Sequence, residues 1–253
     1  MSRSRFAGMN FVIVGGCADI GRMCASVALK EGANVVVTGR REAERAESVA
    51  SLSPLGNVSQ LPLDLSDITS IGAFPRELQA RFQRVDVLLF TSGATRVDAD
   101  GDTPGQIFDD LMAVNARGPY LLTTALKPLL RSGASVVCVS SAIASRRGRG
   151  MVAYAASKAA LEAIVRVTAL DLVERGVRVN AVAPGPTRTA GLLRPLHADD
   201  DPSIRAQRIA SSLPNGRLTE VSEVVEVIMF LASSASSAIN ATTLLADGGW
   251  NAA

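Results

Sequence analysis

The sequence predicts an α/β protein. We expect a single doubly wound domain over residues 1–253, in which a seven-stranded parallel sheet is flanked by helices. Short apolar runs alternate with longer amphipathic segments along the whole chain. The apolar runs are rich in valine, isoleucine and leucine without polar alternation, which is typical of strands covered on both faces. No internal repeat, linker or second hydrophobic unit divides the chain, which favours one domain.

The predicted strands and helices follow one another in order. The strands cover residues 11–14, 34–38, 58–63, 85–90, 135–140, 177–183 and 242–245. The helices cover residues 20–30, 42–51, 68–82, 104–130, 154–175 and 222–232, where the segments between the strands are longer and amphipathic. In such a sheet, ligands bind at the carboxyl ends of the strands, so side chains just after each strand are the candidates for function.

The segment 188–215 interrupts this alternation. It contains His197, the three aspartates Asp199, Asp200 and Asp201, and three prolines. Because it follows the sixth strand, it lies at the ligand-binding edge, and we interpret it as a mobile lid over the substrate. The aspartates by themselves are equally typical of a solvated loop.

Composition and charge argue against several classes of function. With 26 basic and 24 acidic residues, the net charge of +2 gives no field for nucleic acid or a membrane surface. Three cysteines without metal-ligand spacing and a single histidine predict no metal site. No apolar run reaches the roughly 18 residues that a bilayer requires. Free thiols and the lack of an export signal lead us to expect a cytoplasmic protein.

A glycine-rich turn joins the first strand to the first helix. Gly15, Gly16 and Gly21 would allow a tight turn and close approach of the backbone to a pyrophosphate, which the helix N-terminus would attract. This is the arrangement of a Rossmann-type dinucleotide site. Asp19 stands where a middle glycine is usual. Since its charge would repel a phosphate, we expect its side chain to turn away or to cap the helix starting near Ile20.

The residues after the second strand bear on the choice of cofactor. A site for NAD would carry a carboxylate there for the ribose 2′-hydroxyl, whereas a 2′-phosphate requires arginine. Arg40 and Arg41 follow this strand, so we expect NADP(H) to be preferred, with NAD(H) possible. The alternative is that both arginines only solvate the next helix. Asp64, after the third strand, suits a hydrogen bond to the adenine amine or an ordinary turn.

Three residues could act on one carbonyl group. Tyr154 and Lys158 are one helical turn apart and share a helix face, and Ser141 precedes the tyrosine by thirteen positions. A cation beside a phenol lowers the tyrosine pKa from about 10, which would let Tyr154 exchange a proton near neutral pH. The Ser141 hydroxyl could hydrogen-bond the substrate oxygen.

With these parts in this order, the chain resembles the short-chain dehydrogenase/reductase family over essentially its full length. The resemblance rests on the glycine turn, on Asp64, on the serine, tyrosine and lysine, and on the following further motifs: Asn115 in residues 114–118, Pro184-Gly185 with Thr189, and the tail Ala246-Asp247-Gly248-Gly249.

The resemblance implies a proton relay. Tyr154 would exchange the proton with the substrate oxygen, and Lys158 would lower its pKa and bind the nicotinamide ribose. Ser141 would position the oxygen, and Asn115 would hold a water that leads to solvent. Asparagine is a poor residue for a helix interior, and the water-holding role gives it a reason. The predicted cofactor-binding residues are Gly15, Cys17, Asp19, Ile20, Gly21, Arg40, Arg41, Asp64, Leu65, Ser92, Gly93, Tyr154, Lys158, Pro184, Gly185, Thr187 and Thr189.

Two positions depart from the family pattern. One is Asp19. The other is the segment Phe90-Thr91-Ser92-Gly93, where the family usually has Asn-Asn-Ala-Gly. The first asparagine normally braces the sheet, so we expect Phe90 to fill that volume with apolar packing. Neither departure removes a predicted catalytic group.

The predicted function is an NADPH-dependent oxidoreductase acting on a small-molecule carbonyl or alcohol. The substrate could also be a 3-ketoacyl thioester on a carrier, for which Arg175 is a docking candidate, although arginine after a helix also favours the helix dipole. Arg146, Arg147 and Arg149 could attract an anionic substrate or only solvate a loop. The alternative class is a non-catalytic dinucleotide-binding regulator, which would not need Tyr154 and Lys158.

We also expect self-association. The helices predicted at 104–130 and 154–175 carry more apolar residues than one buried stripe needs, namely Leu121, Leu122, Leu126, Leu129, Leu161, Ile164, Val167 and Leu170. The family resemblance implies a homotetramer.

Overall fold

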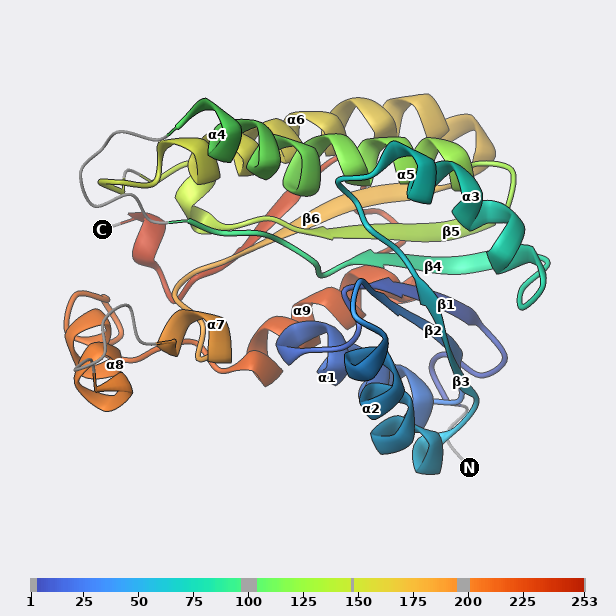
Figure 1. Cartoon of the computed structure of the whole chain (residues 1–253), viewed down its shortest axis with the longest axis horizontal. Helices are drawn as coiled ribbons and strands as arrows, with labels where there is room; N and C mark the ends of the chain where they lie inside the picture. The colour runs from blue at the N-terminus through green and yellow to red at the C-terminus, as the bar shows by residue number, and fades with distance from the viewer. Residues whose placement is uncertain (1–3, 97–103, 147, 195–200, 253) are drawn as a thin grey trace.

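The architecture is a seven-stranded parallel sheet between two layers of helices (Figure 1). The computed structural model describes residues 4–96, 104–146, 148–194 and 201–252. The strands are β1 (Asn10–Val14), β2 (Asn34–Gly39), β3 (Val58–Pro62), β4 (Val85–Phe90), β5 (Leu130–Val139), β6 (Arg178–Pro184) and β7 (Thr243–Ala246). They lie in the order β3-β2-β1-β4-β5-β6-β7. Successive strands are added on one side of β1 up to β3 and on its other side from β4 onward, so the strand order switches between β1 and β4. The predicted fold class and strand count are therefore confirmed.

The helices cover both faces of the sheet. They are α1 (Asp19–Lys30), α2 (Glu42–Leu52), α3 (Ile68–Gln79), α4 (Gly105–Met112), α5 (Gly118–Leu126), α6 (Val152–Leu172), α7 (Ala190–Leu193), α8 (Pro202–Ala210) and α9 (Val221–Ala232). Helices α3 to α6 lie on one face, and α1, α2 and α9 lie on the other (Figure 1). Every residue of β4 is buried, as expected of a central strand covered on both sides.

Each face of the sheet has its own hydrophobic core. Leu78, Leu122 and Leu161 belong to the core under α3, α5 and α6. Phe11 and Met229 belong to the core under α1 and α9. The predicted apolar packing of Phe90 is confirmed, because its ring is 1% exposed within the first core.

The prediction of one helix over residues 104–130 is wrong. Helix α4 ends at Met112, a π turn (η2, Ala113–Arg117) follows, and α5 ends at Leu126. Pro128 explains the end of α5, because proline disfavours helical conformation in the residue before it and cannot donate a backbone hydrogen bond. Strand β5 then begins at Leu130, five residues earlier than expected, with a bulge opposite Val85 and Val87.

The predicted lid contains two short helices, α7 and α8, between β6 and α9. Helix α8 lies beyond the end of the sheet (Figure 1). His197, Asp199 and Asp200 lie outside the described residues, whereas Asp201 caps α8 by accepting a hydrogen bond from the backbone amide of Ser203 at 2.7 Å. The lid role of residues 188–215 stays a prediction.

Candidate active site

The carboxyl end of β5 meets α6, and this junction brings the predicted catalytic residues together. Ser141 lies two residues after the end of β5 and hydrogen-bonds the Tyr154 hydroxyl in the first turn of α6. The Lys158 ammonium lies 5.9 Å from the centre of the Tyr154 ring. The structure thus places Ser141, Tyr154 and Lys158 side by side, as their spacing in the sequence predicts.

The expected effect of Lys158 on Tyr154 is wrong in this structure. Burial raises the pKa of the Tyr154 phenol, and the hydrogen bond from Ser141 only partly opposes this. The lysine ammonium donates a 2.8 Å hydrogen bond to the Val139 carbonyl rather than to the phenol oxygen. Burial therefore sets the direction of the shift in the tyrosine pKa, and the lysine ammonium is directed at the backbone instead of the phenol.

Lys158 is itself strongly perturbed. Its side chain is 3% exposed, and burial lowers the pKa of its ammonium to about 8. Cys138 and Glu162 oppose this shift. A buried lysine with so low a pKa is typical of functional sites, because a purely structural position rarely tolerates the cost of desolvation.

Asn115 lies inside the π turn, and its side chain is fully engaged. Its amide oxygen accepts from the Ala94 backbone at 2.8 Å, and its amide nitrogen donates to the Ala94 carbonyl at 2.8 Å and to the Ser157 hydroxyl at 3.0 Å. The side chain thus links the loop after β4 to helix α6. The expectation that Asn115 holds a water stays a prediction.

The glycine turn after β1 has the shape of a phosphate cradle. Gly15 has a φ of +84°, and a side chain at Gly21 would collide with the Gly15 carbonyl oxygen. A side chain at Gly15 would meet the backbone of Ser92 after β4. The Ser92 hydroxyl is buried without a hydrogen-bond partner among the described residues. A tight glycine turn beside an unpaired hydroxyl fits a dinucleotide, whose phosphates and ribose supply acceptors and donors.

Asp19 does not cap α1, so that part of the prediction is wrong. Helix α1 begins at Asp19 itself, and Ala18 occupies the cap position without a side-chain hydrogen bond. Asp19 has a φ of +39°, an uncommon conformation for a residue with a side chain. Its carboxylate accepts a 3.2 Å hydrogen bond from the backbone amide of Ala190, the first residue of α7. Asp19 therefore links the glycine turn to the predicted lid.

The two predicted arginines after β2 differ in their contacts. Arg41 is exposed and forms an ion pair with Glu44. Arg40 is exposed, and its charge contributes to a lowered pKa of the Asp64 carboxyl: partial burial opposes this shift, and hydrogen bonds from Ser66 and the Arg40 charge outweigh it. Arg40 and Asp64 thus face the same edge of the sheet.

Arg45 was missed from the sequence. Its guanidinium donates to the carbonyls of Gly39 and Arg40, both at 2.9 Å, and so fixes the end of β2. Its place in the first turn of the helix after the Arg40-Arg41 pair is the signal that could have indicated it. Among the other predicted contacts, the Cys17 thiol lies 3.6 Å from the Thr38 carbonyl oxygen.

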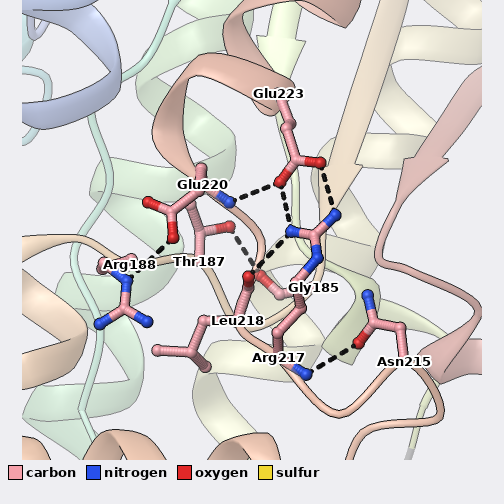
Figure 2. A network of polar contacts seen from close by, with 8 residues as sticks. All are labelled: Gly185, Thr187, Arg188, Asn215, Arg217, Leu218, Glu220 and Glu223. Atoms are coloured by element: carbon pink, nitrogen blue, oxygen red, sulfur yellow. Dashed lines mark hydrogen bonds and ion pairs between the residues drawn. The ribbon is translucent and has the colours of Figure 1, made fainter.

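The residues after β6 lie beside the segment that leads into α9, and polar contacts join the two (Figure 2). Thr187 donates to the Gly185 carbonyl at 2.9 Å and pairs with Thr219, and Thr189 caps α7. Two ion pairs lie here: Arg188, after β6, pairs with Glu220, before α9, at 3.0 Å, and Arg217 pairs with Glu223 at 2.7 Å. Both ends of the lid are thereby held against one another.

A contact with the C-terminal turn was also missed. The Arg146 guanidinium lies 4.8 Å over the Trp250 ring and hydrogen-bonds the Trp250 carbonyl. Trp250 packs in turn against the small apolar cluster of the lid. This contact connects the loop after Ser141 to the lid, so the interpretation of Arg146 as a freely solvated loop residue is wrong. The only sequence signal was that Trp250 is the single tryptophan.

Two kinds of feature are not found among the described residues, a metal site and a membrane-spanning helix. In the part of the chain that the structure describes, no three histidine, cysteine or acidic side chains come together as a metal site. Over the same residues, no helix has the length and apolarity needed to cross a bilayer.

Comparisons with known proteins agree over almost the whole chain. A family model described as enoyl-(acyl carrier protein) reductase matches residues 16–251. A protein of Rattus norvegicus named dehydrogenase/reductase SDR family member 6 is 28% identical over 98% of this chain and 99% of that protein. The structure of a Pseudomonas aeruginosa RhlG/NADP active-site complex has a TM-score of 0.91 at 27% identity, covering 99% of each chain. That of the angucycline C-6 ketoreductase LanV with bound NADP has a TM-score of 0.88 at 26% identity, covering 98% of each.

Proposed function

The chain belongs to the short-chain dehydrogenase/reductase family, and from this premise we propose that it transfers a hydride between NADPH and a carbonyl or secondary alcohol, with Tyr154 exchanging the proton. Membership makes the protein an oxidoreductase that acts on CH–OH groups and binds a nicotinamide dinucleotide. The identity of the cofactor, the substrate and the roles of individual residues are our proposal.

The observation that carries the proposal is the hydrogen bond between Ser141 and Tyr154 beside a buried lysine. In reduction, the Tyr154 hydroxyl donates its proton to the forming alkoxide, and Ser141 holds the same oxygen. The raised pKa of Tyr154 suits this direction, because it keeps the phenol protonated at neutral pH. In oxidation, the phenolate accepts the proton from the alcohol.

Lys158 and Asn115 support this pair. We propose that the Lys158 ammonium binds the nicotinamide ribose, since its side chain is buried and reaches the loop after β4, where Gly93 lies beside it. Asn115 keeps that loop in place through its hydrogen bonds to Ala94. A regulator that only bound the dinucleotide would have no need of a tyrosine held by a serine, which disfavours the non-catalytic alternative.

The preference for NADPH rests on the end of β2. Arg40 is the stronger candidate for a 2′-phosphate, because Arg41 is already paired with Glu44. The solved relatives RhlG and LanV were both obtained with NADP, which supports the same choice. A carboxylate that would favour NAD is absent from residues 38–41.

A 3-ketoacyl thioester is the alternative substrate. Its carrier-docking candidate, Arg175, donates to the Leu130 carbonyl at 3.4 Å, a contact that serves the turn between α6 and β6. This structural use of the guanidinium leaves the free ketone as the better-supported substrate. LanV, a ketoreductase, is similar to the chain over its full length, in line with this choice.

The function is tested with a panel of ketones, aldehydes and 3-ketoacyl thioesters, followed by the absorbance of NADPH. We expect turnover of at least one ketone in the wild type and much less in a Tyr154→Phe variant. Binding of NADPH without turnover of any compound in the panel would favour the non-catalytic regulator.

We further propose a homo-oligomer, with the homotetramer of the family as the expected state. Of the apolar residues predicted for an interface, Val167 and Leu170 on α6 are 59% and 68% exposed. Leu122, Leu126, Leu129 and Leu161 are buried inside the core instead. An exposed apolar stripe on a long surface helix favours a symmetric contact. A monomer in light scattering at micromolar concentration would contradict the proposal.

A further inference from the structure

Three consecutive residues at the end of β5 each hold one polar residue of α6. The Val139 carbonyl accepts from Lys158 at 2.8 Å, the Ser140 hydroxyl donates to Glu162 at 2.7 Å, and Ser141 hydrogen-bonds Tyr154. The three helix residues are spaced by four positions and therefore lie on one face of α6. Two of these contacts involve the proposed catalytic residues, and the third, between Ser140 and Glu162, has no role in the proposed reaction.

The contact between Ser140 and Glu162 is a built part of the site. Ser140 is 3% exposed, and its backbone amide donates to the Val182 carbonyl at 2.7 Å, so β6 fixes its position. Its hydroxyl is then directed at Glu162, whose side chain is only half-buried. The carboxylate is held on the α6 face that also carries Lys158, one turn away.

The groups around Lys158 include few charges. From β5 comes the Cys138 thiol, which burial keeps neutral by raising its pKa to about 12. From α6 come the Tyr154 phenol and the Glu162 carboxylate. From the η2 side comes the neutral amide of Asn115, which with the ammonium encloses Gly93.

Other charged groups on the neighbouring elements point elsewhere. Asp109 and Asp110 of α4 are exposed. Arg178 of β6 donates to carbonyls of α9 and the following turn, at Leu231 and Ser233. Cys138 and Glu162 both oppose the lowered pKa of Lys158; because burial keeps the Cys138 thiol neutral, the Glu162 carboxylate is left as the anion among the described residues.

We propose that Glu162 is a positioning residue for Lys158: held by Ser140, its carboxylate offsets part of the cost of burying the ammonium and keeps Lys158 charged beside Tyr154. The motif extends the tyrosine–lysine pair by one helical turn, to Tyr154, Lys158 and Glu162. The inference rests on the proposed function for its catalytic meaning, but the charge of Lys158 can be measured without turnover.

The chain offers a direct measurement, because it contains only three lysines, Lys30, Lys127 and Lys158. Protein labelled with ¹³C at the lysine ε carbon gives three signals to follow by NMR as pH changes. Lys30 is exposed and Lys127 half-buried, so their two signals serve as internal references. The third signal, assigned by its loss in Lys158→Ala, should titrate at about 8.

Glu162→Gln removes the charge and keeps an oxygen that Ser140 can bond. We expect it to lower the pKa of Lys158 by about 0.5 to 1 pH unit, since an opposite charge nearby favours the ammonium. Glu162→Asp keeps the charge and should restore a titration close to that of the wild type. Asp171→Asn, an exposed neutralisation on the same helix, is the matched control and should leave the Lys158 signal unchanged.

A Lys158 titration that Glu162→Gln leaves unchanged would overturn the proposal. So would Glu162→Asp and Glu162→Gln giving the same shift, because that result would mean a purely structural role. If Glu162→Gln does not fold, Ser140→Ala tests the tether, and we expect it to move the titration in the same direction by a smaller amount.

Kinetics provide a second readout. If Lys158 must be charged, the kcat/KM of carbonyl reduction falls as pH rises through its pKa, and Glu162→Gln moves this fall to lower pH. At pH 8 the variant should be about two- to fivefold slower than the wild type, whereas at pH 6 the two should be nearly equal. An unchanged kinetic profile with a shifted NMR titration would contradict the proposed role of Lys158 but not the action of Glu162 on it.

Discussion

The two parts of the molecule that meet at the proposed site are held together in opposite ways. The junction of β5 and α6 is held by buried polar contacts, such as the bond from Lys158 to Val139, beneath a large core. The lid between β6 and α9 is held by exposed ion pairs, such as that of Arg217 with Glu223. Its described residues add a small cluster in which Ala206, Leu213 and Leu218 are buried.

The two kinds of contact differ in the free energy that is lost when they break. Breaking a buried polar contact leaves an unpaired group and costs about 1–3 kcal/mol, so such contacts hold atoms in fixed positions. An exposed ion pair contributes about 0–1 kcal/mol and can exchange with water. We therefore expect the proposed proton-transfer residues to be fixed before substrate arrives, and the predicted lid to be the part that moves when substrate enters and leaves.

The largest expected effect breaks the buried side of this comparison. Tyr154→Phe keeps the ring and removes the hydroxyl that Ser141 holds. We expect kcat to fall by about 10² to 10⁴-fold, the usual effect of losing a general acid, with unchanged NADPH affinity and melting temperature. In the wild type, the phenolate is the base in alcohol oxidation, so the raised pKa of Tyr154 should keep this direction slow at neutral pH.

The control is the other tyrosine. The chain has two, and Tyr120 on α5 is 46% exposed. Tyr120→Phe should leave kcat unchanged. A Tyr154→Phe enzyme that keeps more than half of wild-type kcat, with chemistry rate-limiting, would require another proton donor.

The second prediction measures what the buried side costs in stability. Lys158 has a pKa of about 8 in the fold and 10.5 in the unfolded chain, so between these values the unfolded chain binds more protons. Its contribution to the free energy of unfolding should therefore rise with pH across this window, by at most about 1.4 kcal/mol per pH unit.

Lys158→Met lacks this titration. Urea unfolding of both proteins at pH 8 and pH 10 should show a more favourable change with pH in the wild type than in the variant. Parallel pH dependence in the two proteins would mean that the lysine is solvated in solution.

The third prediction concerns the exposed cofactor side. Because Arg40 and Arg41 replace the acid of an NAD site, we expect kcat/KM to favour NADPH over NADH by at least about tenfold, or 1.4 kcal/mol. Changing both to alanine should remove most of this preference with little effect on NADH kinetics. Arg40→Ala alone should account for more of the loss than Arg41→Ala, since Glu44 competes for Arg41. A wild type that uses both cofactors equally would refute the assignment.

The smallest effect is expected at Asp19, where the glycine turn contacts the predicted lid. Asp19→Gly removes a charge near the predicted phosphates and suits the φ of +39°. We expect NADPH to bind about threefold more tightly in dilute buffer, with less gain in high salt, because the carboxylate is exposed. Asp19→Asn, which keeps an acceptor for Ala190, should show most of the gain by titration calorimetry. Weaker binding in both variants would mean that the contact with Ala190 organises the site.

The parts of the site that could be predicted from the sequence are those whose contacts join residues close together in the chain. Tyr154 and Lys158 are four residues apart, so helical periodicity places them together without knowledge of the rest of the chain. The hydrogen bond from Ala190 to Asp19 joins positions 171 residues apart, and that from Arg146 to Trp250 joins positions 104 apart. No local pattern encodes such contacts.

The predicted lowering of the Tyr154 pKa was wrong for a related reason. The sequence shows that Lys158 is near but not that the phenol is buried, which depends on the packed fold and raises its pKa. The fold class was predictable because strand burial and the placement of glycines, as at Gly15 and Gly21, repeat at short range. The split of the helix at residues 113–117 was not, since its apolar pattern continues on both sides.

The π turn at Ala113–Arg117 has a consequence for how this region can change. A π turn holds one more residue than the α-helical turn it replaces, and one residue corresponds to about 100° of rotation. Deleting any one residue there would give a continuous helix in which Asn115 and the buried Leu122 could no longer both face their partners. The segment should therefore accept no change of length, and it should accept substitutions best at its less buried positions, Val114 and Arg117.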